Sequence, residues 1–295
     1  MNAVAAIKTK FVWNYIEVLK PRESGLHTLM GVVAALVAVG DIVASGNAFP
    51  LREFVLAAVA IACGIPGCNG LTNYLDRNVD AQMQRTCLRA LPSRRIYPPE
   101  KSLPVIVTLV ILGLALAWLI NLLCFICGLV GVIAAVLWRK TALEVFLGIV
   151  AGCSPVLIGW FAIKPVFSLQ ILSICLLVAV WIPLHVWSLM VAYQDDYRNA
   201  GLHYFPLNWE VKKSVRLLFS LAFLLFAISI FVFFAGEFHL PYLIVAIILG
   251  VVMISACGRL LTSQHSRAAW QVYKLTAFPY LGIIFITMCL DAWLF

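Results

Sequence analysis

The sequence predicts an all-α membrane protein that spans the bilayer with nine transmembrane helices. Of its 295 residues, 63% are hydrophobic and only 12% are charged, which is too few charges for a soluble domain of this length. Apolar runs of about 20 residues recur from end to end, and a helix of that length crosses the ~30 Å hydrocarbon core of a bilayer. The lysines and arginines gather in alternate connections between these runs.

The nine expected helices follow one another with mostly short connections. We place them at residues 25–45, 53–72, 103–120, 122–138, 144–163, 168–190, 215–235, 241–258 and 276–294. The third and fourth are separated by little more than Asn121, so a tight hairpin is expected there. Residues 1–24 are expected to form a cytoplasmic N-terminal segment, and residues 25–295 a single transmembrane domain.

The basic residues predict the orientation of this bundle. If the N-terminus is cytoplasmic, all of the 21 lysines and arginines except Arg52 and Lys164 fall on the inner side, as the positive-inside rule requires. This distribution also explains the net charge of +8, so nothing favours nucleic-acid binding. Residues 1–24 resemble neither a signal peptide nor a mitochondrial transit peptide. A multi-pass protein of a bacterial inner membrane is therefore expected.

The second expected helix contains two features that favour a site at its inner end. Residues 64–70 read GIPGCNG, where Pro66 removes a backbone hydrogen bond and the small residues allow close helix approach. Packing and pocket building both explain this segment. Asn73, Asp76 and Asp80 follow at spacings that place them on one helical face. Because carboxylates one turn apart repel each other, a Mg²⁺ ion shared with substrate phosphates is expected between them.

A second inner loop carries a matching set of polar residues. Asp195, Asp196, Tyr197 and Arg198 follow the sixth expected helix. Carboxylates that hold a metal, together with guanidiniums that bind phosphate oxygens, are what the departure of a diphosphate group requires. Charged inner loops are also ordinary in membrane proteins that bind no metal, so both interpretations stand on the spacing alone.

Five stretches of the sequence together resemble one known family. They are NYLDRNVDAQMQRTCLRALPS (73–93), GCSPVLIGW (152–160), WIPLHVW (181–187), DDYRNAG (195–201) and the final segment with Tyr280, Leu281, Phe285 and Asp291. In this order they resemble the protoheme IX farnesyltransferase (heme O synthase) family of the UbiA-type intramembrane prenyltransferase superfamily. The resemblance covers about residues 20–292, and it implies a prenyltransferase bundle whose active site lies on the cytoplasmic side.

The resemblance implies a Mg²⁺-dependent transfer of the farnesyl group of farnesyl diphosphate to a vinyl group of heme b. Water also adds, so that heme O and diphosphate are the products. It implies catalytic roles for Asn73, Asp76, Asp80, Asp195 and Asp196, with Asp76, Asp80 and Asp196 as metal ligands. It further implies diphosphate contacts from Arg85, Arg89, Arg139, Lys140, Tyr197 and Arg198. A heme A synthase or terminal oxidase assembly factor is the kind of protein partner that it suggests.

His185 and several aromatic residues have two interpretations each. His185 matches the histidine of the family's sixth helix, which predicts a heme contact through the iron or a propionate. A hydrogen bond to a neighbouring helix is the alternative. Aromatic side chains can stabilise a farnesyl cation through their π faces, although packing and interfacial anchoring explain most tryptophans in membrane proteins. The candidates are Trp138, Trp160, Trp181, Trp187 and Tyr197.

Several positions depart from the family pattern and leave the acceptor open. Asn78 stands where a further aspartate is usual, Ala90 replaces a common proline, and LHYFP (202–206) replaces a run closer to IPMLP. A prenyltransferase with another acceptor, such as a quinone precursor or another lipid or aromatic ring, is one alternative. A non-catalytic transporter or heme-handling protein is the other. The sparse intramembrane charge and the absence of an apparent inverted repeat speak against a transporter.

Overall fold

The computed structural model describes residues 3–137 and 143–295, and every element of regular secondary structure within these ranges is a helix. Trp138, Arg139 and Lys140 lie outside the described residues. Eight helical stretches of the described chain are long and apolar enough to cross a membrane, and Leu122–Leu137 is a shorter apolar helix. The predicted all-α membrane fold is therefore confirmed, and the predicted count of nine agrees with these eight stretches and one shorter helix.

The elements run in this order along the chain. They are α1 (Ala3–Val18), α2 (Pro21–Ala44), α3 (Leu51–Asp80), the 3₁₀ turn η1 (Pro99–Ser102), α4 (Leu103–Ile120), α5 (Leu122–Leu137), α6 (Glu144–Ile163), α7 (Leu169–Ala192), α8 (Gln194–Asn199), α9 (Val211–Ala235), α10 (Leu240–Ser263), α11 (Ser266–Leu275), the π-helical segment η2 (Thr276–Gly282) and α12 (Ile283–Leu294).

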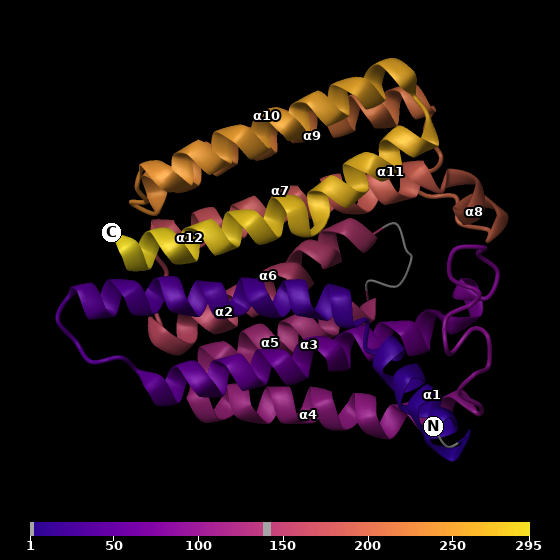
Figure 1. Cartoon of the computed structure of the whole chain (residues 1–295), viewed down its shortest axis with the longest axis horizontal. Coiled ribbons are helices and arrows are strands. Elements are labelled where there is room, and N and C mark those ends of the chain that lie inside the picture. The colour runs from indigo at the N-terminus through magenta and orange to yellow at the C-terminus, as the bar shows by residue number, and fades with distance from the viewer. Residues whose placement is uncertain (1–2, 138–142) are drawn as a thin grey trace.

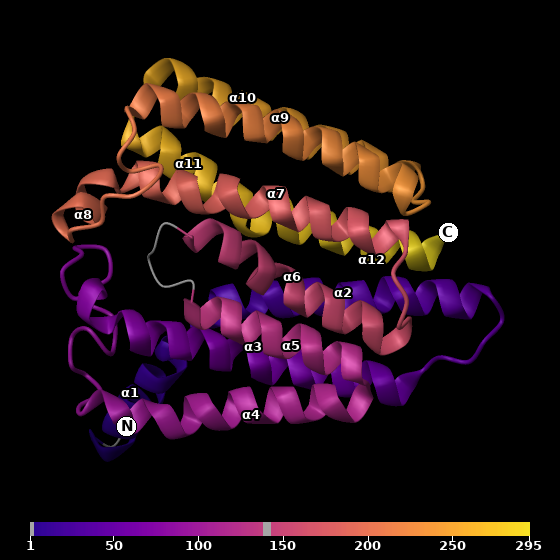
Figure 2. The ribbon, with the colours of Figure 1, turned by 180° about the vertical axis from the view of Figure 1, so that it is seen from behind.

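The long helices lie antiparallel in one bundle, so their connections alternate between its two ends (Figure 1). The loop after α3, the short helix α8 and the α10–α11 connection lie at one end, which we call the basic end. The α2–α3, α6–α7 and α9–α10 connections and the C-terminus lie at the other, which we call the far end (Figure 2). The two exceptional basic residues, Arg52 and Lys164, both belong to the far end.

Close backbone contacts hold the helices around the site together. Helix α2 packs on α6, α3 packs on α4, and α12 returns to contact α2, so the first and last spans close the bundle. A Cβ atom on Gly159 of α6 would lie only 1.9 Å from the backbone oxygen of Gly31 in α2. Only glycine permits this approach, so the conspicuous glycine of the 152–160 segment is explained by packing.

The predicted hairpin at Asn121 is confirmed. Helix α4 ends at Ile120 and α5 begins at Leu122, with Asn121 in an extended conformation between them. The Asn121 side chain accepts from the backbone N–H of Cys124 and donates to the carbonyl of Phe161, at 2.8 Å in each case. It therefore caps the start of α5 and ties the hairpin to α6.

Three boundaries differ from the predicted ones. The N-terminal segment contains helix α1, whose Glu17 pairs with Arg95 at 2.7 Å and so braces the loop after α3. Helix α3 continues through the polar stretch as far as Asp80. The last helical stretch begins at Ser266, because the amphipathic α11 extends the apolar segment toward the basic end and η2 with Pro279 joins it to α12. The predicted spans ended where the run of apolar residues ended, but the helices themselves continue beyond those points.

Candidate functional site

A cavity of about 1310 Å³ opens inside the bundle. Its wall comes from α2 to α8, the loop after α3 and the α11–η2 region. Along α3 the lining extends from Ala60 to Asp80, which is about 30 Å at 1.5 Å per residue. Apolar residues such as Ile61, Leu114 and Ile158 line the part toward the far end, whereas ionisable groups line the part at the basic end.

The three polar residues of α3 share one face, as the spacing predicted. Asn73, Asp76 and Asp80 all line the cavity. The Asp80 side chain is almost completely buried, and its Oδ2 lies 3.1 Å from Nη1 of Arg89. Asn73 donates from Nδ2 to the carbonyl of Val18 at 2.7 Å, so it also joins the cavity wall to the end of α1. The first motif thus brings carboxylates and a guanidinium to one side of the cavity.

Arg85 is the clearest anion-binding group of the cavity. Its Nη2 donates to the hydroxyl of Tyr197 at 3.4 Å, and its guanidinium lies 5.5 Å from the ring centre of Tyr193. Its Nε, however, is buried and has no hydrogen-bond partner in the structure. Burial alone lowers the pKa of Arg85, but the nearby Tyr197, Tyr273 and Asp80 raise it above its usual value. The group remains a cation with a buried donor left for a ligand.

Tyr197 complements Arg85 at the same wall. Its side chain is buried and lines the cavity. Burial raises the pKa of Tyr197 to about 12, although the neighbouring Arg85 opposes the shift. The phenol therefore stays protonated at physiological pH. Since its oxygen accepts from Arg85, its own proton remains to be donated to another acceptor.

The other members of the second motif have a different position. Asp195, Asp196 and Arg198 are not among the cavity-lining residues. The two carboxylate oxygens of Asp196 accept from the backbone N–H groups of Gln84 and Arg85, at 2.6 and 3.1 Å. Asp196 therefore fixes the turn that presents Arg85 to the cavity. The metal-ligand role of Asp196 and the catalytic role of Asp195 stay predictions.

Arg198 shows the same supporting geometry. Its Nε and Nη2 donate to the carbonyl of Leu207 at 3.1 and 2.7 Å, which closes the loop between α8 and α9. The diphosphate contact predicted for Arg198 thus stays a prediction, as do those for Arg139 and Lys140 outside the described residues. The sequence could show that the second motif lay near the first, but not which of its side chains faced inward.

His185 lies in a second polar cluster of the cavity. Its ring stacks on Trp181 at 4.8 Å and lies 4.6 Å from Tyr273. Nδ1 of His185 is 2.8 Å from the hydroxyl oxygen of Thr276, and that hydroxyl donates to the carbonyl of Tyr273 at 2.7 Å. A hydroxyl has one proton, so both contacts are hydrogen bonds only if Nδ1 of His185 carries hydrogen. Nε2 is then the ring nitrogen with the lone pair.

The two predicted interpretations of His185 therefore coexist in its geometry. The hydrogen bond to a neighbouring helix is present through Thr276, at the junction of α11 and η2. That bond holds the ring in place and leaves Nε2 available as an electron-pair donor, which is the usual arrangement for a metal-binding histidine. Trp181, which packs on the ring, also lines the cavity and donates from Nε1 to the Thr276 carbonyl at 2.5 Å.

The predicted aromatic candidates fall into two groups, those that line the cavity and those that do not. Trp181 and Tyr197 line the cavity, as expected of groups near a cation. Trp160 is fully buried near the far end, where its Nε1 donates to the Val166 carbonyl at 3.1 Å. Trp187 packs on Phe205 with ring centres 4.7 Å apart. Neither Trp160 nor Trp187 is among the lining residues, so packing explains both.

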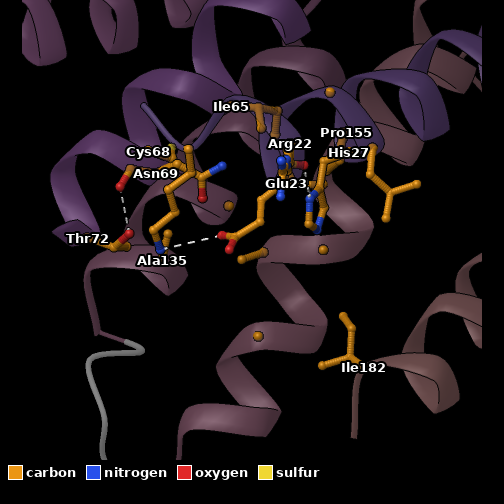
Figure 3. Close-up of a pocket in the computed structure, with 18 of the residues that line it drawn as sticks. Arg22, Glu23, His27, Ile65, Cys68, Asn69, Thr72, Ala135, Pro155 and Ile182 are labelled. Atoms are coloured by element: carbon orange, nitrogen blue, oxygen red, sulfur yellow. Dashed lines mark hydrogen bonds and ion pairs between the residues drawn. The ribbon is translucent and has the colours of Figure 1, made fainter. Parts of the chain in front are cut away.

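Sequence reasoning missed several ionisable residues of the cavity wall. Glu23 and His27 lie one turn apart on α2 and reach into the cavity beside Arg22 (Figure 3). Glu144 of α6 also lines it and accepts a hydrogen bond from the hydroxyl of Tyr204. The available signal was the rarity of ionisable residues in apolar helices. Glu23 falls in the expected N-terminal segment 1–24, where charge is unremarkable, and His27 falls in the first turn of the expected span 25–45, where it matches no family motif.

The residues present fit a magnesium ion that is shared with a substrate. Among residues 3–137 and 143–295, no three His, Cys, Asp or Glu side chains are gathered closely enough to hold a metal by themselves. Mg²⁺ does not require such a cage, because it is commonly held by one or two carboxylates, waters and substrate phosphates. Asp76 and Asp80 line the same cavity as Arg85 and Arg89, which supplies both halves of a metal–diphosphate site.

Comparison with known sequences identifies relatives over most of the chain. The UbiA prenyltransferase family matches residues 32–282. A protoheme IX farnesyltransferase of Desulforudis audaxviator is 33% identical over 288 residues, covering 95% of this chain and 88% of the relative. Protoheme IX farnesyltransferase 1 of Picrophilus torridus is 34% identical over 229 residues, covering 75% of this chain and 76% of the relative.

Solved structures share the same fold at low sequence identity. A structure of a digeranylgeranylglyceryl phosphate synthase aligns with a TM-score of 0.76 at 19% identity, covering 96% of this chain and 99% of that one. A UbiA homologue from Archaeoglobus fulgidus bound to DMAPP and Mg²⁺ aligns with a TM-score of 0.70 at 17% identity, covering 95% and 99%. The predicted helical bundle is thereby confirmed.

Proposed function

Because this chain belongs to the UbiA prenyltransferase family, we propose that it transfers the farnesyl group of farnesyl diphosphate to a vinyl group of heme b. The products are heme O and diphosphate. The relatives of 33% and 34% identity, both named protoheme IX farnesyltransferases, support this choice of donor and acceptor.

The observation that carries the proposal is one cavity with two different polar regions. Asp76, Asp80, Arg85 and Arg89 line one region, and His185 lines the other. A volume of about 1310 Å³ exceeds the roughly 300–1,000 Å³ typical of a site for one small ligand. The cavity thus has room for a prenyl diphosphate and a large flat acceptor at the same time.

The diphosphate occupies the region at the basic end. Asp76 and Asp80 would hold Mg²⁺, which would supply positive charge to the oxygens of the leaving diphosphate. Arg85 contributes its buried Nε donor, and Tyr197 contributes its remaining hydroxyl proton. These charge-assisted contacts strengthen as negative charge builds on the departing group, so they lower the barrier to breaking the carbon–oxygen bond.

The apolar part of the cavity receives the farnesyl chain. Ile61, Leu114 and Ile158 offer only hydrocarbon to that chain. Excluding water there protects the allylic cation from premature capture before the acceptor reacts. The indole of Trp181 offers its π face to the same positive charge.

Heme b occupies the region near α7 and η2. His185 binds the heme iron through Nε2, while Thr276 fixes the ring through Nδ1. This contact places the macrocycle, and therefore a vinyl group, in the cavity that also holds the farnesyl carbon. The stacked Trp181 restricts the same ring and so defines the plane of approach.

The membrane position follows from the same arrangement. The apolar helices place the protein in a bilayer as a multi-pass protein. We place the basic end, and with it the N-terminus, on the cytoplasmic side of a bacterial inner membrane. The charged diphosphate of the donor then enters the cavity from water. A heme A synthase or a terminal oxidase assembly factor is a fitting consumer of the product.

Purified protein tests this proposal when supplied with farnesyl diphosphate, heme b and Mg²⁺. Farnesylated heme should appear by mass spectrometry in step with released diphosphate, and Mg²⁺ chelation should stop both. Matched reactions with a quinone precursor or a glycerol phosphate lipid test the alternative acceptors. Turnover of one of these, without farnesylated heme, would assign the chain to another acceptor. Diphosphate release from none of them would refute the prenyltransferase assignment.

A further inference from the structure

The cavity contains a carboxylate that diphosphate departure does not use. Glu23 lies in the first turn of α2, and its side chain reaches into the cavity (Figure 3). About half of this side chain, 51%, is accessible, and that surface is turned to the cavity. An ionisable residue in an apolar helix that lines a cavity is expected to have a function.

Glu23 shares the cavity with both polar regions. Its Oε2 lies 3.6 Å from Nζ of Lys20. His27, one turn further along α2, lies edge-on to Trp181 with ring centres 6.5 Å apart, and Trp181 stacks on His185 of the heme region. Asp80 and Arg89 of the diphosphate region line the same cavity. The Glu23 carboxylate therefore lies in the cavity where the farnesyl carbon and the vinyl group must meet.

His27 adds a second acceptor on the same face of α2. Its Nδ1 lies 2.9 Å from the backbone carbonyl of Glu23, which can only accept, so Nδ1 carries the hydrogen. Nε2 is left with the lone pair when the ring is neutral. The Glu23 carboxylate and Nε2 of His27 thus supply two acceptors, as many as a water molecule has protons.

The proposed reaction creates a need for such a group. The farnesyl carbon–oxygen bond breaks and the electron pair of the vinyl group forms the new carbon–carbon bond. A cation remains on the vinyl carbon attached to the porphyrin. Water attacks this carbon through oxygen, and the product becomes a neutral alcohol only when that oxygen loses a proton to a base. When no base is placed beside that oxygen, the same cation instead loses a carbon-bound proton to the departed diphosphate or to water and gives an alkene.

The other carboxylates of the described cavity wall have other partners. Asp76 and Asp80 lie with the guanidiniums of the diphosphate region, and Asp80 pairs with Arg89. Glu144 accepts a hydrogen bond from Tyr204. Glu23 lies on a different helix, one turn before His27, whose ring packs against Trp181 of the heme region.

We propose that Glu23 is the catalytic base that takes the proton from the attacking water, with His27 holding that water in place. Lys20 forms an ion pair with that carboxylate. This proposal rests on the proposed function, since it concerns the second half of the same reaction. It predicts that Glu23 determines which product forms, whereas Asp76 and Asp80 determine whether any product forms.

The experiment compares wild type, Glu23→Gln, Glu23→Asp and the control Glu53→Gln, a far-end glutamate paired with Arg52. Each is supplied with farnesyl diphosphate, heme b and Mg²⁺ in water enriched in heavy oxygen, and the products are separated by mass. In wild type and Glu53→Gln the alcohol carries the label. In Glu23→Gln the ratio of alcohol to alkene should fall at least ~10-fold while diphosphate release continues. Glu23→Asp should restore part of the alcohol.

The outcomes separate the two proposals. An unchanged alcohol-to-alkene ratio in Glu23→Gln overturns the role of Glu23. Loss of all farnesylated heme in both Glu23 variants, with farnesyl diphosphate still bound, also overturns it and assigns the residue to the first step. If wild type itself forms no farnesylated heme, the proposed function fails instead. His27→Gln, which keeps a neutral acceptor, should lower the alcohol fraction less than Glu23→Gln does.

Discussion

The two ends of the bundle each contain a buried aspartate, but they use it differently. At the far end, Asp291 of α12 accepts from the backbone N–H of His239 at 2.8 Å, the N–H of Tyr242 at 3.3 Å and Nδ1 of His239 at 3.0 Å. These groups begin α10, so Asp291 acts as its cap from a distant part of the chain. At the basic end, Asp80 pairs with Arg89 on the wall of a cavity.

The difference shows where the molecule leaves binding capacity for a ligand. Within the described chain, the single buried side-chain N or O atom without a partner is Nε of Arg85, at the basic end. Burying a polar donor without a partner is unfavourable by about 1–3 kcal/mol. An anion that accepts a hydrogen bond from this Nε removes that cost. At the far end Asp291 satisfies the donors that begin α10, whereas at the basic end Nε of Arg85 is a buried donor left for a ligand.

The largest effect is expected from Asp76→Asn. Removing the charge while keeping the shape should lower the rate of diphosphate release at least ~100-fold, the scale seen when one transition-state contact is lost. The thermal unfolding temperature of the purified protein should stay unchanged. Asp41→Asn, a far-end aspartate paired with Lys164, is the matched control. Full activity of Asp76→Asn would remove the metal role.

Arg85→Lys sharpens the comparison by keeping the charge and deleting the planar fork. Because a hydrogen bond to a charged group contributes about 1.5–3 kcal/mol, the apparent affinity for farnesyl diphosphate or the rate should fall roughly 10- to 100-fold. Inorganic diphosphate should compete less well in the same assay. Equal inhibition constants for diphosphate in wild type and variant would show that Arg85 does not contact it.

Asp291→Asn should have the opposite result, lowering the stability of the protein while leaving its catalytic activity unchanged. The substitution weakens the cap of α10 and leaves the buried donors imperfectly paired, so the free energy of unfolding should fall by about 1–3 kcal/mol. Activity per folded molecule should equal that of wild type. A selective loss of activity, at unchanged stability, would mean that the far end takes part in the reaction.

Lys164→Met is expected to have the smallest effect. Its Nζ pairs with Asp41 at 2.6 Å, but both side chains are about one-third exposed. An ion pair of this exposure contributes about 0–1 kcal/mol. Activity should be unchanged and the unfolding temperature should shift by at most a few degrees. A much larger loss of stability would show that this pair is shielded from solvent within the membrane-embedded protein.

Much of this arrangement was predictable from residue order. Apolar runs indicated the spans because the bilayer core requires a fixed helix length, and Asn121 correctly marked the hairpin. The face shared by Asn73, Asp76 and Asp80 followed from helical geometry alone. The extension of the last stretch back to Ser266 was missed, because α11 is amphipathic and breaks the apolar pattern without breaking the helix.

Residue order and helical spacing could not predict which way the side chains of the loops point. Asp196 and Tyr197 are adjacent in sequence, yet one accepts backbone N–H groups of the turn at 84–85 and the other lines the cavity. Glu23 and His27 were overlooked for a related reason. Their importance depends on the α7 and α11 residues that face them, which lie more than a hundred residues away in the chain.

The sequence by itself determined the membrane environment, the positions of most spans, the end at which charge collects and the motif that resembles a prenyltransferase. These are local properties, since hydrophobic length and helical spacing are fixed by near neighbours along the chain. Only the tertiary structure decided which polar groups face one cavity, how Thr276 orients His185, and that Glu23 lines the same cavity as both polar regions. Those facts depend on how helices distant in sequence pack against one another, and packing is a property of the assembled bundle.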